Sequence, residues 1–110
     1  IKIENLAKLN LMYSSTSKQD TENKKSQFIQ KYREANMIAP NTFAIRGFDI
    51  TFDALLRLSQ AQEFKETLMT VATEQFENKF AYAKRSDKGF RNTGFYILYY
   101  DTDLSIKTAN

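Results

Sequence analysis

The sequence of 110 residues has the length of one domain, and its 42% apolar and 14% aromatic content suffices for a hydrophobic core, which excludes a disordered chain. The net charge of +3 arises from 16 basic and 13 acidic residues that are interspersed, so no concentrated basic face for nucleic acid is expected. Cysteine and histidine are absent, which excludes disulfides, thiol nucleophiles, imidazole bases and the common zinc sites.

The first half of the chain is predicted to form a strand followed by two helices. Residues 9–14 alternate apolar and polar side chains and run into a polar stretch, as a strand does when it enters a loop. Apolar residues at helical spacing then predict a helix near 22–36. Pro40 interrupts this pattern, because proline cannot continue a helical hydrogen-bond ladder, and a second helix follows near 42–59.

The second half is predicted to end in a β-hairpin. Residues 64–72 suggest a third, shorter helix, and residues 76–82 alternate in the manner of a half-buried strand. Residues 86–89 have turn composition. Residues 95–100 are continuously apolar and aromatic, which predicts a strand. A tight turn at residues 101–103 then leads to a last strand over residues 104–108. The predicted fold is α/β: a small sheet covered by two or three helices with a C-terminal β-hairpin.

The helix near 42–59, which Asn41 or Thr42 caps, is the most clearly amphipathic segment. One stripe is apolar and is expected to pack on the sheet: Phe48, Phe52, Leu55 and Leu56. A second stripe is polar: Arg46, Asp49, Asp53 and Arg57. This polar stripe either holds the carboxylate and ammonium of a ligand or forms a solvated face of exposed ion pairs.

Two further places suggest contact with a ligand, each with a structural alternative. Tyr13, Ser14 and Ser15 lie where the first predicted strand leaves the sheet, a common ligand position in α/β folds, although they also suit a simple polar loop. Gly47 inside a helix indicates close approach of another backbone or of a bound molecule, and close packing of the helix on its own sheet is the plainer explanation.

Several segments together resemble one family. They are residues 28–33, residues 38–40, residues 43–49 with the following Leu55-Leu56, residues 78–82, residues 89–92 and residues 94–101. In this order they resemble the C-terminal part of type I periplasmic binding proteins of the leucine/isoleucine/valine-binding kind. The resemblance covers nearly all of this chain but about the last third of a family domain. These sequence segments are particularly similar to binding-protein-like regions that follow peptidoglycan-binding LysM repeats in some bacterial envelope proteins.

The resemblance implies a non-catalytic cell-envelope binding module. Residues 1–110 would be a single domain or a domain fragment, located in the periplasm or cell envelope, with the export signal and the peptidoglycan-binding LysM repeats elsewhere in the full protein. It implies a link to amino-acid transport and a ligand such as an amino acid or a cell-wall fragment; the alternative is a structural or protein-interaction domain that keeps the fold without a ligand. We expect no enzyme activity, cofactor, metal, nucleic acid or membrane span. The expected ligand-binding residues are Tyr13, Ser14, Ser15, Arg46 and Asp49.

Two expectations concern the chain in solution. Half of a two-lobed cleft leaves a ligand wet, so binding of leucine with micromolar affinity is not expected. The aromatic density of residues 95–100 predicts either an exposed patch around Phe90, Phe95, Tyr96 and Tyr99 or an unpaired sheet edge. Self-association, as a homodimer or by strand exchange, is the expected consequence.

Overall fold

The computed structural model of the chain describes residues 2–19, 23–60, 63–68, 72–87 and 89–109. Helices and short antiparallel strands share these residues, so the predicted α/β class is confirmed. The helices are α1 (Ile3–Lys8), α2 (Ser26–Asn36), α3 (Thr42–Leu58) and α4 (Phe64–Leu68). The strands are β1 (Met12–Ser15), β2 (Thr73–Glu74), β3 (Lys79–Phe80), β4 (Tyr82–Lys84), β5 (Phe90–Asn92), β6 (Tyr96–Tyr100) and β7 (Ile106–Thr108).

The predicted boundaries around α3 agree well with the structure. Asn41 is the residue before the helix, and its side-chain oxygen accepts a hydrogen bond from the Ala44 backbone N–H at 2.9 Å, which satisfies one of the free amides of the first turn. α2 ends at Met37, whose backbone is left-handed with φ of 61°, shortly before Pro40. The short helix α1 was not predicted from the sequence.

Antiparallel pairing joins the two ends of the chain in one sheet, in the order β1-β6-β7. Met12 of β1 lies opposite Tyr99 of β6, and Ser15 lies opposite Tyr96. The N-terminal strand and residues 95–100 are thus neighbours in one sheet, and the pairing of β6 with β7 confirms the predicted C-terminal hairpin. Two separate hairpins, β2-β3 and β4-β5, complete the strands.

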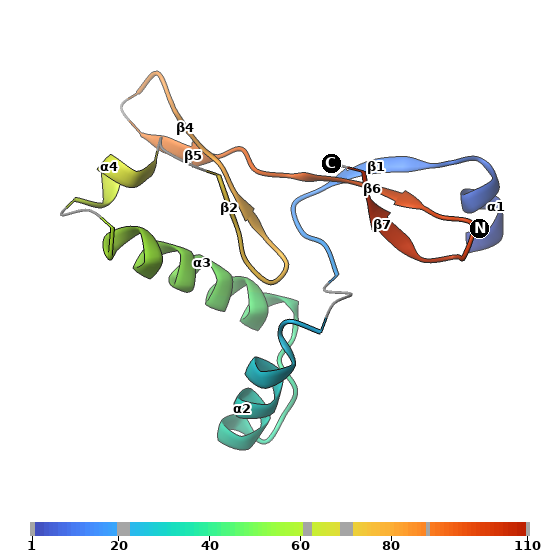
Figure 1. Cartoon of the computed structure of the whole chain (residues 1–110), viewed down its shortest axis with the longest axis horizontal. Coiled ribbons are helices and arrows are strands. Elements are labelled where there is room, and N and C mark those ends of the chain that lie inside the picture. The colour runs from blue at the N-terminus through green and yellow to red at the C-terminus, as the bar shows by residue number, and fades with distance from the viewer. Residues whose placement is uncertain (1, 20–22, 61–62, 69–71, 88, 110) are drawn as a thin grey trace.

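The molecule is open rather than spherical (Figure 1). The β1-β6-β7 sheet with α1 occupies one end, α3 runs beside the β2-β3 hairpin at the other, and α2 projects away from both. Its radius of gyration is 16.7 Å, against about 13 Å for a compact chain of this length. The few buried apolar residues in the described part of the chain agree with this shape: Ala7, Ile45, Leu68, Phe80, Tyr96 and Leu98.

The single strand predicted over residues 76–82 is confirmed only in its second half, which contains β3 and the start of β4, and is wrong for residues 76–78. The chain instead reverses direction between β2 and β3, where the Gln75 N–H donates to the Asn78 carbonyl oxygen at 2.9 Å. The apolar alternation at Phe76 and Phe80 imitates a strand, but Phe76 lies in the turn itself. Its side chain packs against the rings of Phe28 and Phe48, with centroids 5.9 and 5.2 Å away.

The predicted orientation of α3 is also wrong, because the helix buries its polar stripe. Its buried residues are Ile45, Asp49, Asp53 and Arg57. Three of the four residues expected in the core are exposed instead: Phe52, Leu55 and Leu56. Phe48 alone is partly covered, by an aromatic cluster with Phe28 of α2 and Phe76 of the hairpin. The expected solvated face of exposed ion pairs is therefore the most buried part of the helix.

The predicted aromatic patch at the C-terminal end is largely covered. Tyr96 is only 1% exposed, and Phe90 and Tyr99 are half-buried, whereas Phe95 is exposed. Large exposed apolar side chains gather on α3 instead. None of the helices in the described ranges is long and apolar enough to span a membrane.

Candidate functional site: a lysine-lined cleft

The segment after β1 connects the two ends of the molecule. Ser17 forms an isolated antiparallel bridge with Asn78, and the Lys18 N–H donates to the Glu77 carbonyl oxygen at 2.9 Å. This crossing joins the β1-β6-β7 sheet to the β2-β3 hairpin. A hollow lies on each side of this crossing segment, because a single stretch of chain does not fill the space between the β1-β6-β7 sheet and the β2-β3 hairpin.

A second seam holds the same two parts together further along the chain. A Cβ on Gly94 would lie 2.5 Å from the Lys79 carbonyl oxygen, so only glycine fits this close approach. The Asn92 amide donates to that carbonyl at 2.8 Å, and its oxygen accepts from the Ala81 and Gly94 amides at 2.8 and 2.9 Å. The position of β6 relative to β3 is thereby fixed.

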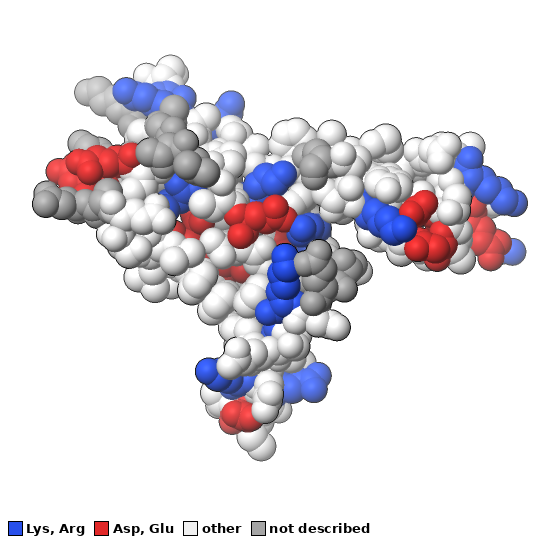
Figure 2. All heavy atoms as spheres, viewed as in Figure 1, with Lys and Arg blue, Asp and Glu red and all other residues white. Residues whose placement is uncertain are grey.

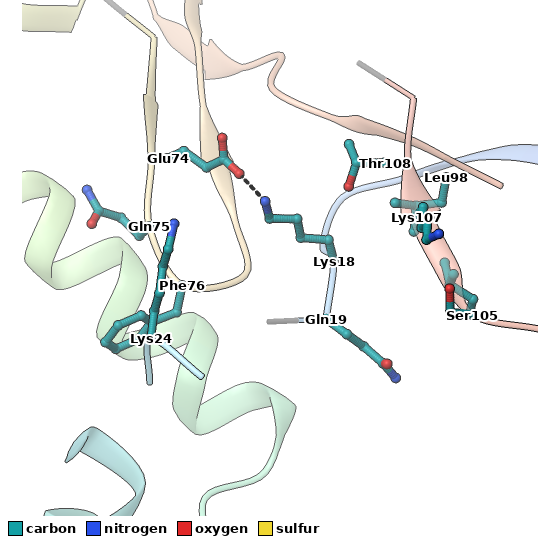
Figure 3. A pocket seen from close by; sticks show the side chains of 11 residues that line it. Lys18, Gln19, Lys24, Glu74, Gln75, Phe76, Leu98, Ser105, Lys107 and Thr108 are labelled. Atoms are coloured by element: carbon teal, nitrogen blue, oxygen red, sulfur yellow. Dashed lines mark ion pairs between the residues drawn. The ribbon is translucent and has the colours of Figure 1, made fainter. Parts of the chain in front are cut away.

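The larger hollow, here called the cleft, has a volume of about 640 Å³. It lies between the β2-β3 hairpin, the crossing segment and the β6-β7 hairpin. Figure 3 shows side chains from all three around it. Its lining is Lys18, Gln19, Lys24, Glu74, Gln75, Phe76, Leu98, Ser105, Ile106, Lys107 and Thr108. Charged, amide, hydroxyl and apolar groups thus meet in one open space.

An ion pair stands in the wall of the cleft. Lys18 Nζ lies 2.6 Å from Glu74 Oε1, with 30% and 42% of the two side chains exposed, and Figure 3 shows the pair spanning the gap between crossing segment and hairpin. Partial burial opposes ionisation of Glu74, but the hydrogen bond from Lys18 and the positive charges of Lys18 and Lys79 outweigh it and lower the pKa of this carboxyl. Glu74 is therefore ionised at neutral pH.

Tyr96 lies behind this pair. The amino groups of Lys18 and Lys79 lie 5.2 and 4.8 Å from the centroid of its ring, close enough for attraction between each cation and the ring. Its buried hydroxyl has no partner in hydrogen-bonding geometry among the described residues, although the Glu74 carboxylate is near. Burial, and then the charge of Glu74, raises the pKa of the Tyr96 hydroxyl.

The smaller hollow lies on the other side of the crossing segment and has a volume of about 630 Å³. It shares Lys18, Gln19, Leu98 and Ile106 with the cleft. Its remaining lining is Tyr13, Ser15, Ser17, Lys25, Pro40, Asn41, Thr42, Ile45 and Glu77. Lys25 Nζ contacts Glu77 Oε2 at 2.8 Å, so a second lysine–glutamate pair faces this side.

The buried polar stripe of α3 holds the hairpin in place. The Asp49 carboxylate accepts hydrogen bonds from the Phe76 and Glu77 backbone amides at 3.1 and 2.9 Å and from the Asn78 side chain at 2.8 Å. Turn amides that lack a backbone partner are costly to bury, and the carboxylate satisfies them. Asp49 therefore positions the strand that carries Glu74.

Asp53 and Arg57 form the second part of this network. The Arg57 Nε donates to Asp53 at 2.8 Å, and a second guanidinium nitrogen donates to the Thr67 carbonyl oxygen at 2.7 Å. Asp53 also accepts from the Thr73 hydroxyl and from the Gln75 amide. Because Gln75 lines the cleft, this network connects the buried face of α3 to the wall of the cleft.

The five sequence-predicted ligand residues do not converge on one site. Tyr13 and Ser15 line the smaller hollow, and Ser14 lines a separate shallow depression that also includes Ser15. Asp49 is fully enclosed beneath the hairpin, and Arg46 lies over the ring of Phe43, with 5.9 Å from its guanidinium carbon to the ring centroid. Their role in ligand binding stays a prediction.

Sequence reasoning missed the residues that build the cleft. Lys18, Glu74 and Gln75 sit in segments that the sequence marks only as polar, and they meet because the crossing segment touches the hairpin. Gly47, for which a closely packed neighbour was expected, has open space around it: nothing lies within 4 Å of where its Cβ would be. No described group of three or more His, Cys, Asp and Glu side chains is arranged to hold a metal ion.

Comparisons with family models, with curated proteins and with solved structures found no match.

Proposed function

We propose that the chain is a non-catalytic binding module whose cleft takes a small zwitterion, such as an amino acid or a cell-wall peptide fragment. The supporting observation is the Lys18–Glu74 pair, in which opposite charges lie 2.6 Å apart in the cleft wall and both remain partly exposed. An amino acid carries the same two charges at a similar separation. Its carboxylate can pair with Lys18 and its ammonium with Glu74, because a partly exposed ion pair contributes little stability and exchanges readily.

The rest of the lining suits such a ligand. Hydroxyl and amide groups that can donate or accept hydrogen bonds surround the pair: Gln19, Gln75, Ser105 and Thr108. Phe76 and Leu98 supply apolar surface for a ligand side chain. A few polar groups that orient the ligand beside apolar surface is the usual composition of small-molecule sites.

The proposal of binding without catalysis rests on the chemical groups present. The sequence contains no Cys and no His, and two of the three lysines that line the cleft are engaged with carboxylates: Lys18 with Glu74, and Lys107 with Asp101 and Asp103. A lysine held charged by an adjacent carboxylate is a poor nucleophile or base, since both roles need the neutral amine. It is well suited to hold an anion.

The cellular setting is proposed from the sequence resemblance to type I periplasmic binding proteins. We place the module in the bacterial periplasm or cell envelope, attached in the full protein to LysM repeats that bind peptidoglycan. A ligand released from the cell wall is then locally available. The sequence of the complete gene product tests this placement, and a full-length protein without an export signal would contradict it.

Titration followed by nuclear magnetic resonance tests the cleft. Leucine, alanine and alanyl-alanine are added to the 110-residue chain, and we expect saturable shifts of the Lys18, Glu74 and Gln75 amides with dissociation constants of about 1 mM. The affinity is weak because the open cleft leaves much of the ligand in water. Leucinamide and N-acetylleucine, which each lack one charge, should bind several times more weakly.

Matched variants separate the cleft from general charge effects. Lys18→Gln should abolish the saturable shifts, whereas Lys8→Gln on the exposed surface of α1 should leave them unchanged. Shifts that survive Lys18→Gln, or that are equal for leucine and leucinamide, contradict the proposal. Micromolar affinity would show that the chain holds a complete enclosed site.

A second candidate function is a structural or protein-interaction domain without a ligand. The observation that favours it is the exposed apolar surface of α3, where Phe43 is 74% exposed and Leu55 60% exposed. A large exposed apolar patch is typical of a surface that contacts another protein. Absence of any saturable binding in the titration, together with association through α3, would support this candidate.

A further inference from the structure

The hydroxyl group of Tyr96 is buried without a hydrogen bond. The residue is 1% exposed, and its hydroxyl oxygen is the one enclosed side-chain polar atom that lacks a partner in the described ranges. Folded proteins pair nearly all of their buried polar groups, because an unpaired one is unfavourable. A tyrosine at this place therefore needs an explanation that a phenylalanine, with the same ring and no hydroxyl, would not.

The ring that carries this hydroxyl is held in place. The amino groups of Lys18 and Lys79 lie 5.2 and 4.8 Å from the ring centroid. The close approach of Gly94 to the Lys79 carbonyl oxygen fixes the chain just before β6 begins. Turning the ring out into solvent would break both contacts with the lysines. The hydroxyl therefore stays beside the β2-β3 hairpin, and a partner has to reach it there.

Glu74 is the acceptor within reach. Its carboxylate acts on the Tyr96 hydroxyl more strongly than any other charged group, ahead of Asp49, although the two are not in hydrogen-bonding geometry. Asp49 already accepts from three donors beneath the hairpin. Glu74 is held by Lys18 through Oε1, and 42% of its side chain is exposed, which leaves it room to turn. A carboxylate can accept several hydrogen bonds at once.

We propose that Tyr96 is a positioning residue for Glu74 when a ligand occupies the cleft, an inference that rests on the function proposed above. The ligand carboxylate takes Lys18, so Glu74 loses its cation, turns toward Tyr96 and accepts a hydrogen bond from the hydroxyl. This bond holds the Glu74 carboxylate ionised and directs it toward the ligand ammonium. The hydroxyl that is unpaired in the free chain is paired in the complex.

The positions of the three side chains suit this exchange of partners. Lys18 and Glu74 are partly exposed, and Figure 2 shows acidic and basic atoms side by side in the middle of the molecule, where a ligand can reach them. Tyr96 lies behind the pair, away from water. A hydrogen bond to a charged acceptor is stronger than one between neutral groups, and burial strengthens it further. We therefore expect the hydroxyl to raise the affinity for leucine about tenfold.

The arrangement also predicts which ligands depend on Tyr96. Leucine has a carboxylate that can take Lys18 and release Glu74. Leucinamide has the same ammonium and side chain but no carboxylate, so the Lys18–Glu74 pair stays intact and the hydroxyl gains no partner. Tyr96 thus favours a zwitterion over a cation of the same shape, although it does not line the cleft itself.

The direct test compares Tyr96→Phe with Tyr99→Phe in the magnetic resonance titration. Tyr96→Phe should weaken leucine binding about tenfold and change leucinamide binding by less than about twofold. Tyr99 is on the same strand but points to the other face of the sheet, so Tyr99→Phe should change neither. Leucine binding that is unchanged by Tyr96→Phe, or equal weakening of both ligands, would overturn the proposal.

Urea denaturation of Tyr96→Phe without ligand excludes a merely structural role. The variant should be no less stable than the unmodified chain, so that binding is lost while stability is kept. A loss of stability as large as the loss of binding would show that the hydroxyl is already paired in the free chain, which contradicts the proposal. In a Glu74→Gln background, Tyr96→Phe should alter leucine affinity by less than about twofold, because Tyr96 acts through Glu74.

A second measurement needs no variant. Tyrosine labelled with carbon-13 at Cζ reports on the hydroxyl, and the Tyr96 signal should shift with leucine along the same saturation curve as the Lys18 amide. Leucinamide should leave it unchanged. If the unmodified chain shows no saturable leucine binding, the proposed function fails and this inference with it. If leucine binds and Lys18→Gln abolishes binding, but the Tyr96 signal does not move, the cleft is retained and the role of Tyr96 alone is refuted.

Discussion

The two ends of the molecule bury opposite kinds of surface. In the β1-β6-β7 sheet the inward side chains are Tyr96 and Leu98 of β6, as an alternating strand predicts. In α3 the inward face consists mainly of Asp49, Asp53 and Arg57, and the apolar side chains face outward. The difference shows that periodicity identifies the two faces of an element, whereas its neighbours decide which face is covered.

The neighbour of α3 explains the inversion. The turn between β2 and β3 presents backbone amides at Phe76 and Glu77 that need acceptors, and Asp49 supplies both oxygens. An apolar face of α3 packed there would leave these amides unsatisfied at a cost of about 1–3 kcal/mol each. The β6 strand meets no such demand, because its amides are used by β1 and β7.

The largest effect is expected from removing the carboxylate under the hairpin. Asp49→Ala leaves three donors without this acceptor, two of them buried and one partly buried, and should lower the free energy of unfolding by about 4 kcal/mol. Urea denaturation followed by circular dichroism measures this. Asp87→Ala, at an exposed position, is the control and should change stability by less than about 0.5 kcal/mol. Similar stability of the two variants would break the comparison.

A core truncation in the sheet should cost somewhat less. Leu98→Ala removes a side chain that is 6% exposed and leaves a cavity, with an expected loss of about 3 kcal/mol. The same truncation at Leu55 on α3 should cost below about 1 kcal/mol, because that side chain already faces water. A large loss at Leu55 instead would mean that the face of α3 is covered in solution.

The seam between the two ends is the next test. Gly94→Ala places a methyl group against the Lys79 carbonyl oxygen and should destabilise the chain by about 2 kcal/mol. Gly47→Ala introduces the same group into open space and should not destabilise the isolated chain. Thermal unfolding of both variants at low concentration gives the contrast, and equal melting temperatures would argue against the close approach at Gly94.

Removing the buried Tyr96 hydroxyl behind the Lys18–Glu74 pair should act in the opposite direction. Tyr96→Phe removes a hydroxyl that has no hydrogen-bond partner among the described residues. We expect unchanged stability or a gain of up to about 1 kcal/mol, because a buried unsatisfied group is unfavourable. A loss above about 1 kcal/mol in urea denaturation would indicate that the hydroxyl is satisfied in solution.

The smallest effect concerns pH. The pKa of the Glu74 carboxyl is lowered, so its contribution to stability is present above the ordinary carboxyl pKa and is lost as the pH falls through the lowered value. Because the pair is partly exposed, solvent screening limits this contribution to about 0.3 kcal/mol. Glu74→Gln should therefore flatten the acid side of the stability profile slightly, and an unchanged profile would show that the pair contributes nothing.

In this chain the sequence predicts local structure better than it predicts the contacts between segments that are far apart in the sequence. The α/β class, the cap at Asn41, the span of α3 and the C-terminal hairpin follow from short-range rules. The hairpin turn at residues 75–78 was missed because Phe76 and Phe80 alternate as they would in a strand. The cleft was missed because Lys18 and Glu74 are far apart in the sequence and meet only through contacts that no periodicity encodes.

The pairing of β1 with β6 has a consequence for the order of folding. Residues 12–15 lie opposite residues 96–99, so this sheet forms only after nearly the whole chain has been synthesised and its two ends have met. Closing so long a loop carries a large entropic cost and slows folding. The contacts of α3 with the β2-β3 hairpin span shorter stretches of sequence. During translation the network around Asp49 can therefore assemble while β6 is still inside the ribosome, with the sheet closing as the last event.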